Sequence, residues 1–337
     1  MTERIRSLEG LEASMGRLAS DTARALKVLD YLDEHALRWI ESSTFAAALV
    51  TEAAAGACKS LVAGGPRGFI AADSRSITLP RANVDQATAP APGQGWGSLF
   101  IVPGMNESLR VNGKVSDVDQ VCIRVCVEEC YLHCAKAFLR SEFWTPVAGA
   151  TPAEPAAFAL ATRFMLLATA DAVGKADLSP KGDPAGKLLH TEDGDWSFPD
   201  RPGNRRVDGF RNLLANPFTE LLAIVPGANR LLQVRGRTEL STNEALREHF
   251  AVDGRRPPLV VRIRAAEHAL VSSGALQRAR LWATDHPAPK LDATEIFKAH
   301  IKQSRARGIG SSVTRAAVSL PCVLKKSLDR DYEDNLY

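Results

Sequence analysis

The chain has 337 residues, of which 45% are hydrophobic, so it is long enough for two domains or one large one with a packed core and is not intrinsically disordered. Its net charge of +3 is small for this length, and no run of Lys and Arg interleaved with aromatic residues is present, which argues against a nucleic-acid partner. Residues 1–20 lack the apolar core of a signal peptide, and the most apolar windows, 45–58 and 158–172, contain Glu52 and Arg163, so we expect a cytoplasmic protein outside the membrane.

The N-terminal segment has the pattern of amphipathic helices. Within residues 9–42, a series of mainly apolar positions recurs at intervals of three and four: Leu11, Met15, Leu18, Thr22, Leu26 and Leu29. This spacing predicts one or two helices that cover a core, and residues 1–30 are assigned to an N-terminal helical extension. From Phe45 onwards, short apolar runs are broken by glycine, which predicts a sheet with tight turns.

Four cysteines follow one another at intervals of four residues, at Cys122, Cys126, Cys130 and Cys134. This interval places the thiols on one face of either a strand or a helix. It lacks the two-residue gaps of the usual zinc and iron–sulfur sites. We therefore predict reduced, half-buried thiols rather than metal ligands.

The segment 178–217 is rich in turn residues and arginine. It predicts two polar loops, 179–184 and 199–206, on either side of a β-hairpin at 192–195. Apolar residues at helical spacing then predict a helix, with Asn204 as its N-cap and with its end at Asn216. Arg205 and Arg206 would fall in its first turn, where free backbone N–H groups and guanidinium groups suit a phosphate monoester. The alternative is an exposed arginine pair that binds nothing.

An internal repeat divides the chain. Residues 101–115, IVPGMNESLRVNGKV, and residues 224–238, IVPGANRLLQVRGRT, agree at eight of fifteen positions at an offset of 123. A period this long indicates duplicated domains rather than a solenoid. We predict one repeat over 31–146, a Pro- and Ala-rich linker over 147–157, a second repeat over 158–290, and a helical tail over 291–337.

The two halves differ where chemistry is expected. The first half has no counterpart of GNRRVDGFRNLLANP, but it ends in HCAKAFLRSEFWTP, where Lys136, Arg140 and Trp144 are four residues apart. The second half keeps the arginine loop, but its end, ALVSSGALQRARLW, replaces Cys-Ala-Lys by Ser-Gly. Neither half is complete alone.

Several of these motifs, in order, resemble the FMN-binding split-barrel proteins related to pyridoxamine 5'-phosphate oxidase. They are SPKGDPAG, FPDRPGNRRVDGFRNLLANP and LLAIVPGANRLLQVRGRTELS, and the chain looks closest to a bacterial branch that also has an HCxKAxxRSxLW-like end. The resemblance implies a mainly β fold with flanking helices (α+β). It implies two tandem FMN-binding split β-barrels that pack as a pseudo-dimer within one chain.

The resemblance also implies a cofactor site. Arg205 and Arg206 match the residues that hold the FMN phosphate, and Ser179, Pro180 and Lys181 match the strand along the isoalloxazine and ribityl chain. The full set of expected cofactor-binding residues is Arg205, Arg206, Ser179, Pro180, Lys181, Asp200, Arg201, Asn204, Gln233, Lys136, Arg140 and Trp144. We expect one FMN in a composite cleft between the halves. In the alternative, Lys136 and its neighbours belong to a decayed second cleft.

The function expected from this resemblance is an FMN-dependent oxidoreductase. It would transfer hydride at flavin N5 to or from a small molecule, with oxygen, NADH or NADPH as the redox partner. The alternatives are a non-catalytic flavin-binding or haem-binding carrier or sensor, and a scaffold with empty clefts. The sequence assigns no catalytic residue and no metal, and it leaves open a monomeric pseudo-dimer or a homodimer.

Overall fold

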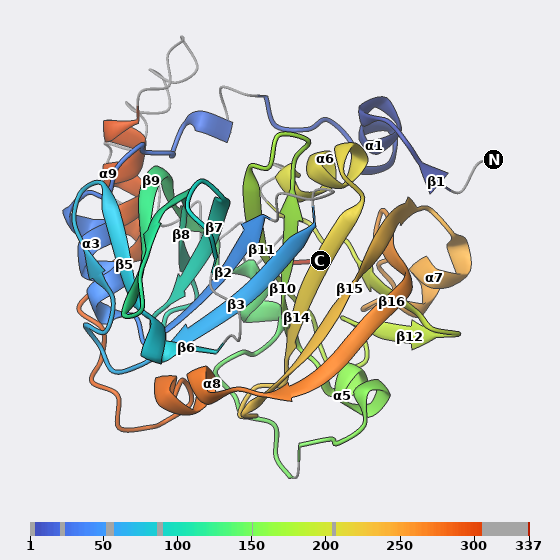
Figure 1. Ribbon diagram of the computed structural model, residues 1–337. Helices are drawn as coiled ribbons and strands as arrows, with labels where there is room; N and C mark the ends of the chain where they lie inside the picture. The colour runs from blue at the N-terminus through green and yellow to red at the C-terminus, as the bar shows by residue number, and fades with distance from the viewer. Residues whose placement is uncertain are drawn as a thin grey trace.

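The computed structural model describes residues 4–20, 24–51, 57–85, 90–149, 151–203, 207–304 and 336–337. Two antiparallel sheets lie side by side, each curled and flanked by helices (Figure 1). The first sheet contains β2 (Phe45–Thr51), β3 (Cys58–Gly64), β4 (Ala71–Ala72), β5 (Ser76–Pro80), β6 (Val84–Asp85), β7 (Gly95–Ile101), β8 (Ser108–Val118) and β9 (Cys122–His133). The second contains β1 (Arg4–Ile5), β10 (Phe164–Ala170), β11 (Ala176–Gly182), β12 (His190–Glu192), β13 (Asp195–Pro199), β14 (Phe218–Ile224), β15 (Arg230–Ser241) and β16 (Val260–Ser272).

Short helices connect and cover the strands. They are α1 (Leu8–Met15), α3 (Glu34–Ser42), the 3₁₀ helix η1 (Arg81–Asn83), α4 (Lys136–Arg140), α5 (Pro155–Ala161), α6 (Asp208–Ala215), α7 (Glu244–His249), α8 (Gly274–Ala279) and α9 (Ala293–Gln303). The predicted class, mainly β with flanking helices, is confirmed. Within the described part of the chain, no helix has the length and apolar character needed to cross a membrane.

The two sheets share one strand order. Leaving aside β6, which pairs with β3, and β1, which pairs with β15, the first follows β3-β2-β7-β8-β9-β5-β4 and the second follows β11-β10-β14-β15-β16-β13-β12. Matched in this way, the hairpin β7–β8 corresponds to β14–β15. The repeated IVPG sequences of residues 101–104 and 224–227 begin at the end of the first strand of each hairpin.

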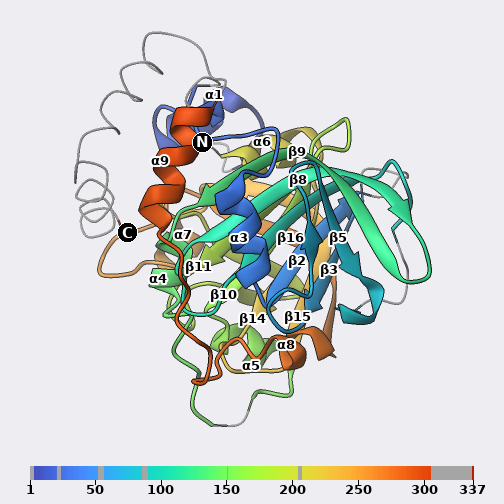
Figure 2. The ribbon, with the colours of Figure 1, turned by 90° about the vertical axis from the view of Figure 1, so that its left-hand side faces the viewer.

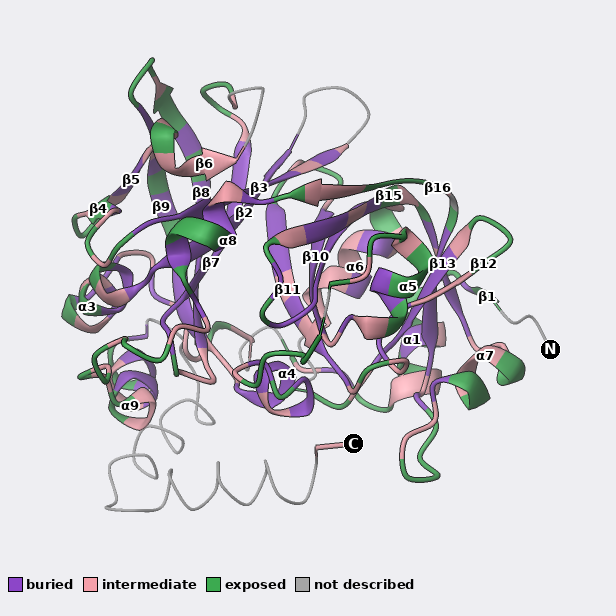
Figure 3. Cartoon of the chain, turned by 90° about the horizontal axis from the view of Figure 1, so that it is seen from below, coloured by how far each residue is buried: buried purple, intermediate pink, exposed green. Residues whose placement is uncertain are grey.

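Three clusters of buried side chains form the core, one for each sheet and one between the sheets. Along β2, Ala46 and Ala48 belong to the core of the first sheet, whereas Ala47 and Leu49 belong to the cluster between the sheets. Because successive side chains of a strand point to opposite faces, β2 is buried on both sides. The same is true of β7 and β10, which Figure 3 shows in the colour of buried residues.

Two helices cross between the halves. α4 follows the first sheet in the chain but packs on β11, and α8 follows the second sheet but packs on β3. Glycine permits both contacts: a Cβ atom at Gly182 would lie 1.9 Å from the main-chain oxygen of Ala137, and one at Gly64 would lie 1.9 Å from that of Ala275. The end of each half is therefore held against the sheet of the other.

The N-terminal helix is shorter than the apolar spacing predicts. α1 ends at Met15 because Gly16 adopts a φ of 78°, and Leu18 is buried beyond the helix. Leu29 is not helical either but forms an isolated bridge with Cys130. β1 and α1 pack on the second sheet, whereas α3 and α9 cover the first (Figure 2). Most of the predicted tail, residues 305–335, lies outside the described part.

The prediction that the four spaced cysteines share one face is wrong. The ladder between β8 and β9 skips Glu128, and this bulge reverses the alternation of faces. Cys126, before the bulge, is exposed, while Cys130, after it, is buried in the core of the first sheet. Among the described residues, no cluster of His, Cys, Asp or Glu is suited to hold a metal ion.

Candidate functional site

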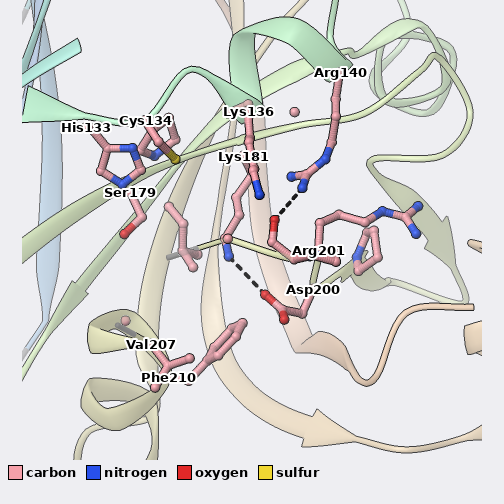
Figure 4. A pocket seen from close by; sticks show the side chains of 18 of the residues that line it. His133, Cys134, Lys136, Arg140, Ser179, Lys181, Asp200, Arg201, Val207 and Phe210 are labelled. Carbon is pink, nitrogen blue, oxygen red and sulfur yellow. Dashed lines mark hydrogen bonds and ion pairs between the residues drawn. The ribbon is translucent and has the colours of Figure 1, made fainter. Parts of the chain in front are cut away.

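A cavity of about 370 Å³ lies where α4 of the first half meets β11 and the loop after β13 (Figure 4). This volume is within the range of small-molecule sites. Both halves contribute its wall. The first half supplies Arg110, Tyr131, His133, Cys134, Lys136, Ala137 and Arg140; the second supplies Leu167, Ser179, Pro180, Lys181, Gly182, Asp183, Leu188, Pro199, Asp200, Arg201, Pro202, Gly203, Val207, Asp208, Gly209, Phe210 and Pro258; Met15 of α1 completes it.

Seven of the residues expected at the cofactor site line this one cavity. They are Lys136, Arg140, Ser179, Pro180, Lys181, Asp200 and Arg201. The first two come from α4 and the others from the second half, so the structure brings together two segments that are far apart in the sequence. Figure 4 shows the side chains of Lys136 and Arg140 extending from α4 toward those of Lys181 and Asp200.

One wall is a strand rather than the predicted loop. Residues 179–182 belong to β11, which pairs with β10 alone and forms an edge of the second sheet. An edge strand tolerates Pro180, since a proline there need not break a ladder hydrogen bond. β11 therefore presents Ser179, Pro180 and Lys181 at the cavity.

The opposite wall is the loop that follows the hairpin β12–β13. The predicted hairpin is confirmed, and Asp193 and Gly194 form its turn with φ values of 51° and 80°, as the favoured two-residue turn requires. The hairpin directs residues 199–203 toward β11. There Lys181 Nζ lies 3.5 Å from Asp200 Oδ1 and 4.7 Å from the centre of the Phe210 ring.

A second buried ion pair fixes the same loop. Arg201 Nε donates to Asp183 Oδ2 at 2.8 Å, and Arg201 Nη2 donates to the oxygen of Phe250 at 2.7 Å. Asp183 has no exposed surface, and burial raises its pKa to about 6 against the opposing effect of Arg201. Burial likewise raises the pKa of Asp200. The two charged residues of the loop are thus both paired: Asp200 with Lys181 of β11, and Arg201 with Asp183, which directly follows β11.

Stability is expected to fall as the pH rises through the titration range of Asp183. The folded chain holds this proton up to a pKa of about 6, whereas the unfolded chain releases it near the ordinary value of 3.8. Between these values the unfolded state binds fewer protons, so the free energy of unfolding falls by up to about 3 kcal/mol and then levels off. Urea unfolding from about pH 4 to pH 7 should show this fall in the wild type and not in Asp183→Asn. Equal pH profiles for the two proteins would contradict it.

α4 places two buried cations at the cavity. Lys136 is 3% exposed and Arg140 is 8% exposed. Arg140 donates to the main-chain oxygens of Pro202 and Leu336, and its guanidinium lies 5.7 Å from the centre of the Tyr337 ring. Burial lowers the pKa of Arg140, and within the described ranges no carboxylate pairs with it. Asp183 and Asp200 oppose this lowering of the Arg140 pKa through their charge.

Arg110 joins the two halves beside the cavity. Its guanidinium pairs with the Asp177 carboxylate and donates to Tyr131 Oη at 2.7 Å, to Ser179 Oγ at 3.2 Å and to the oxygen of Leu178. Arg110 is 2% exposed. A residue of β8 thereby binds three consecutive residues of β11.

Trp144 and Gln233 do not line the cavity, contrary to expectation. α4 ends at Arg140, and Glu142 turns the chain with a φ of 45°, so Trp144 leaves the helical face and donates Nε1 to the oxygen of Met105 at 3.0 Å. Gln233 lies on β15, opposite Leu222 and Ala269.

The β-hairpin residue that lines the cavity comes from the first half. The repeat offset of 123 matches Gln233 to Arg110, and Arg110 is the residue at the cavity. Other lining residues that the motifs did not identify include Tyr131, Asp183 and Phe210. The offset is the signal that could have found Arg110.

The predicted phosphate loop is described only in part. Asn204, Arg205 and Arg206 lie outside the described residues, but Gly203 and Val207, their neighbours in the chain, line the cavity. The predicted helix is present over Asp208–Ala215, and the expectations for Asn204, Arg205 and Arg206 lie outside the described residues. α6 begins at Asp208 because Val207 takes the cap position in a left-handed conformation, with a φ of 49°.

Comparison with known proteins identifies the second half. Residues 151–272 match the family model described as Pyridoxamine 5'-phosphate oxidase. No curated protein matches the chain. Similar solved structures include HupZ of Group A Streptococcus, with 21% identity over 34% of this chain and 88% of that chain and a TM-score of 0.27. General Stress Protein 26 of Bacillus anthracis str. Sterne has 12% identity over 35% of this chain and 95% of that chain, with a TM-score of 0.27. An F420 reductase has 16% identity over 35% of this chain and 98% of that chain, also with a TM-score of 0.27. Residues 151–272 therefore belong to the pyridoxamine 5'-phosphate oxidase-like family.

Proposed function

We propose that the protein is an FMN-dependent oxidoreductase that acts on a small molecule and binds one FMN in the cavity between its halves. The observation that carries the proposal is the composition of that cavity. Lys136 and Arg140 from the first half face Ser179, Lys181 and the loop of residues 199–203 from the second. Within this family, a cleft formed by two barrels is where a flavin would be expected.

The chemistry of the wall fits FMN. Buried cations suit a phosphate, and Pro180, Val207 and Phe210 offer apolar surface to an aromatic ring. Asp183 Oδ1 is buried and has no hydrogen-bond partner among the described residues. Because an orphaned buried carboxylate oxygen is costly, a hydroxyl donor such as those of the ribityl chain would satisfy it.

The phosphate anchor proposed is Arg205 and Arg206, with Asn204 beside them. Both chain neighbours of this segment, Gly203 and Val207, line the cavity, which supports the assignment. When bound, FMN supplies the hydride chemistry at N5. The chain's own residues would hold the phosphate, and β11 and Phe210, which line the cavity, would contact the ring.

We further propose that the chain arose by tandem duplication, with repeats over 31–146 and 158–290 joined by 147–157 and packed as an intrachain pseudo-dimer. The common strand order of the two sheets supports this. So does the reciprocal packing of α4 on β11 and α8 on β3.

The residues at the equivalent junction of α8 and β3 are not suited to hold FMN. Arg278 of α8 matches Arg140 in the repeat, but its guanidinium donates to Asp85 Oδ1 at 2.8 Å, to the oxygen of Asn83 at 2.8 Å and to that of Gly64 at 3.0 Å. Asp85 therefore neutralises Arg278, whereas its counterpart Arg140 has no paired carboxylate among the described residues. The first half also lacks the Arg205-Arg206 sequence.

The purified protein is expected to be yellow, with one FMN per chain. An absorption spectrum with flavin quantified per chain tests the site, and bleaching by NADH, NADPH or an amine followed by recovery in air tests the activity. Two flavins per chain would contradict the single-cleft proposal, and a protein that binds no flavin would contradict the proposed function. Bound FMN that no donor reduces would instead indicate a carrier or sensor.

A further inference from the structure

Arg110 lies at the junction of the halves and is absent from the cofactor motifs, and its guanidinium contacts Tyr131, Asp177, Leu178 and Ser179. It lies on β8 between Leu109 and Val111, which point into the core of the first sheet, so its own side chain points toward the second sheet. There its terminal nitrogens engage Asp177, Leu178 and Ser179 of β11.

These contacts, which we call the clamp, hold β11 at three consecutive residues, Asp177, Leu178 and Ser179. Ser179 Oγ also donates to Asp177 Oδ2 at 2.9 Å, so the carboxylate, the guanidinium and the hydroxyl form a closed network. The planar fork of arginine can bind several acceptors at once, which a lysine ammonium on its flexible stem does not reproduce. Because β11 is an edge strand, its outward carbonyl at Leu178 has no ladder partner on that side and is satisfied by Arg110.

Burying such a pair adds little stability on its own. Arg110 is 2% exposed and Asp177 is 6% exposed, and the desolvation of two buried charges offsets much of their attraction. The matching position of the second half carries no charge, since Gln233 stands there. The arginine-centred network is thus built on the side of the cavity, whereas at the equivalent junction Glu220 of β14 accepts from the main-chain nitrogen of Ser60 in β3 at 2.7 Å.

We propose that Arg110 is a positioning residue for the flavin site, through which the first half fixes the cofactor strand of the second. It holds Ser179, and with it Pro180 and Lys181, in the conformation that lines the cavity. This inference rests on the proposed function for the identity of the ligand. The contacts of Arg110 with β11 do not depend on FMN, so this part of the proposal can be tested in the FMN-free protein.

The test compares Arg110→Gln, which copies the residue of the second half, with Arg110→Lys. Arg110→Gln should weaken FMN binding at least about tenfold, because it removes charge-assisted bonds to β11. Arg110→Lys should recover part of the affinity by pairing with Asp177. Gln233→Ala, at the matched position of the other half, should bind FMN as the wild type does.

Two further readouts separate positioning from a merely structural role. The visible circular dichroism of FMN at saturation reports the orientation of the ring, and it should change in Arg110→Gln. Amide hydrogen exchange of the FMN-free protein should become faster at residues 178–181 in Arg110→Gln and stay unchanged in β3. Thermal unfolding of each variant shows whether it is folded.

Each outcome decides something distinct. Unchanged exchange at residues 178–181 would overturn the clamp even if the wild type binds no FMN, a result that would separately refute the proposed function. Faster exchange with unaltered FMN affinity and dichroism would overturn the positioning role. If Arg110→Gln does not fold, the test passes to Arg110→Lys. FMN affinity and dichroism equal to those of the wild type in that variant would overturn the positioning role as well.

Discussion

Replacing Arg205 and Arg206 together by alanine is expected to release FMN from the purified protein. Two charge-assisted hydrogen bonds to a phosphate contribute about 1.5–3 kcal/mol each, so their loss should raise the dissociation constant by about 10²–10⁴-fold. A micromolar site would then be empty under ordinary purification. Titration of the FMN-free variant, followed by the fluorescence of free flavin, measures the change.

Arg81→Ala provides the matched control in the first half. Arg81 lies in η1, the segment that stands where the second half has its arginine loop, and it donates Nη1 to the oxygen of Asp119 at 2.8 Å on the surface. FMN binding should not change in this variant. If the double variant kept FMN while Arg140→Ala lost it, the phosphate would be assigned to α4 instead.

The sequence was most informative where patterns are local or repeated. The hairpin at 192–195 follows from its turn residues, and the alternation of short apolar runs with glycine predicts the sheets. The contribution of α4 to a site in the second half was inferred from what each half lacks, and the structure places Lys136 and Arg140 at that cavity.

The errors arise where one residue changes the direction of the chain. The bulge at Glu128 moves Cys130 to the other face, and the left-handed Glu142 takes Trp144 away from the face of Lys136. Neither departure has a signal in the spacing. Gln233 lies away from the cavity for another reason: the wall takes its β-hairpin residue, Arg110, from the first half and its loop from the second half, and only the packing shows this.

Substitution of Gly182 by alanine is expected to both destabilise the protein and abolish FMN binding. A Cβ atom there would lie 1.9 Å from the oxygen and 2.7 Å from the carbonyl carbon of Ala137, so the backbone of α4 must move away from β11. Overpacking of this kind costs about 1–3 kcal/mol of folding free energy or more. It also displaces Lys136 and Arg140, because both belong to the helix that moves. Urea unfolding and FMN titration measure the two effects separately.

Gly64→Ala is the control that separates these effects, because its Cβ would meet the oxygen of Ala275 at the same 1.9 Å across the equivalent junction of α8 and β3. It should lower the free energy of unfolding by a similar amount, yet the folded protein should still bind FMN. Equal loss of FMN in the Gly64 and Gly182 variants would mean that binding depends on the stability of the whole fold. Loss in the Gly182 variant alone would tie it to the placement of α4.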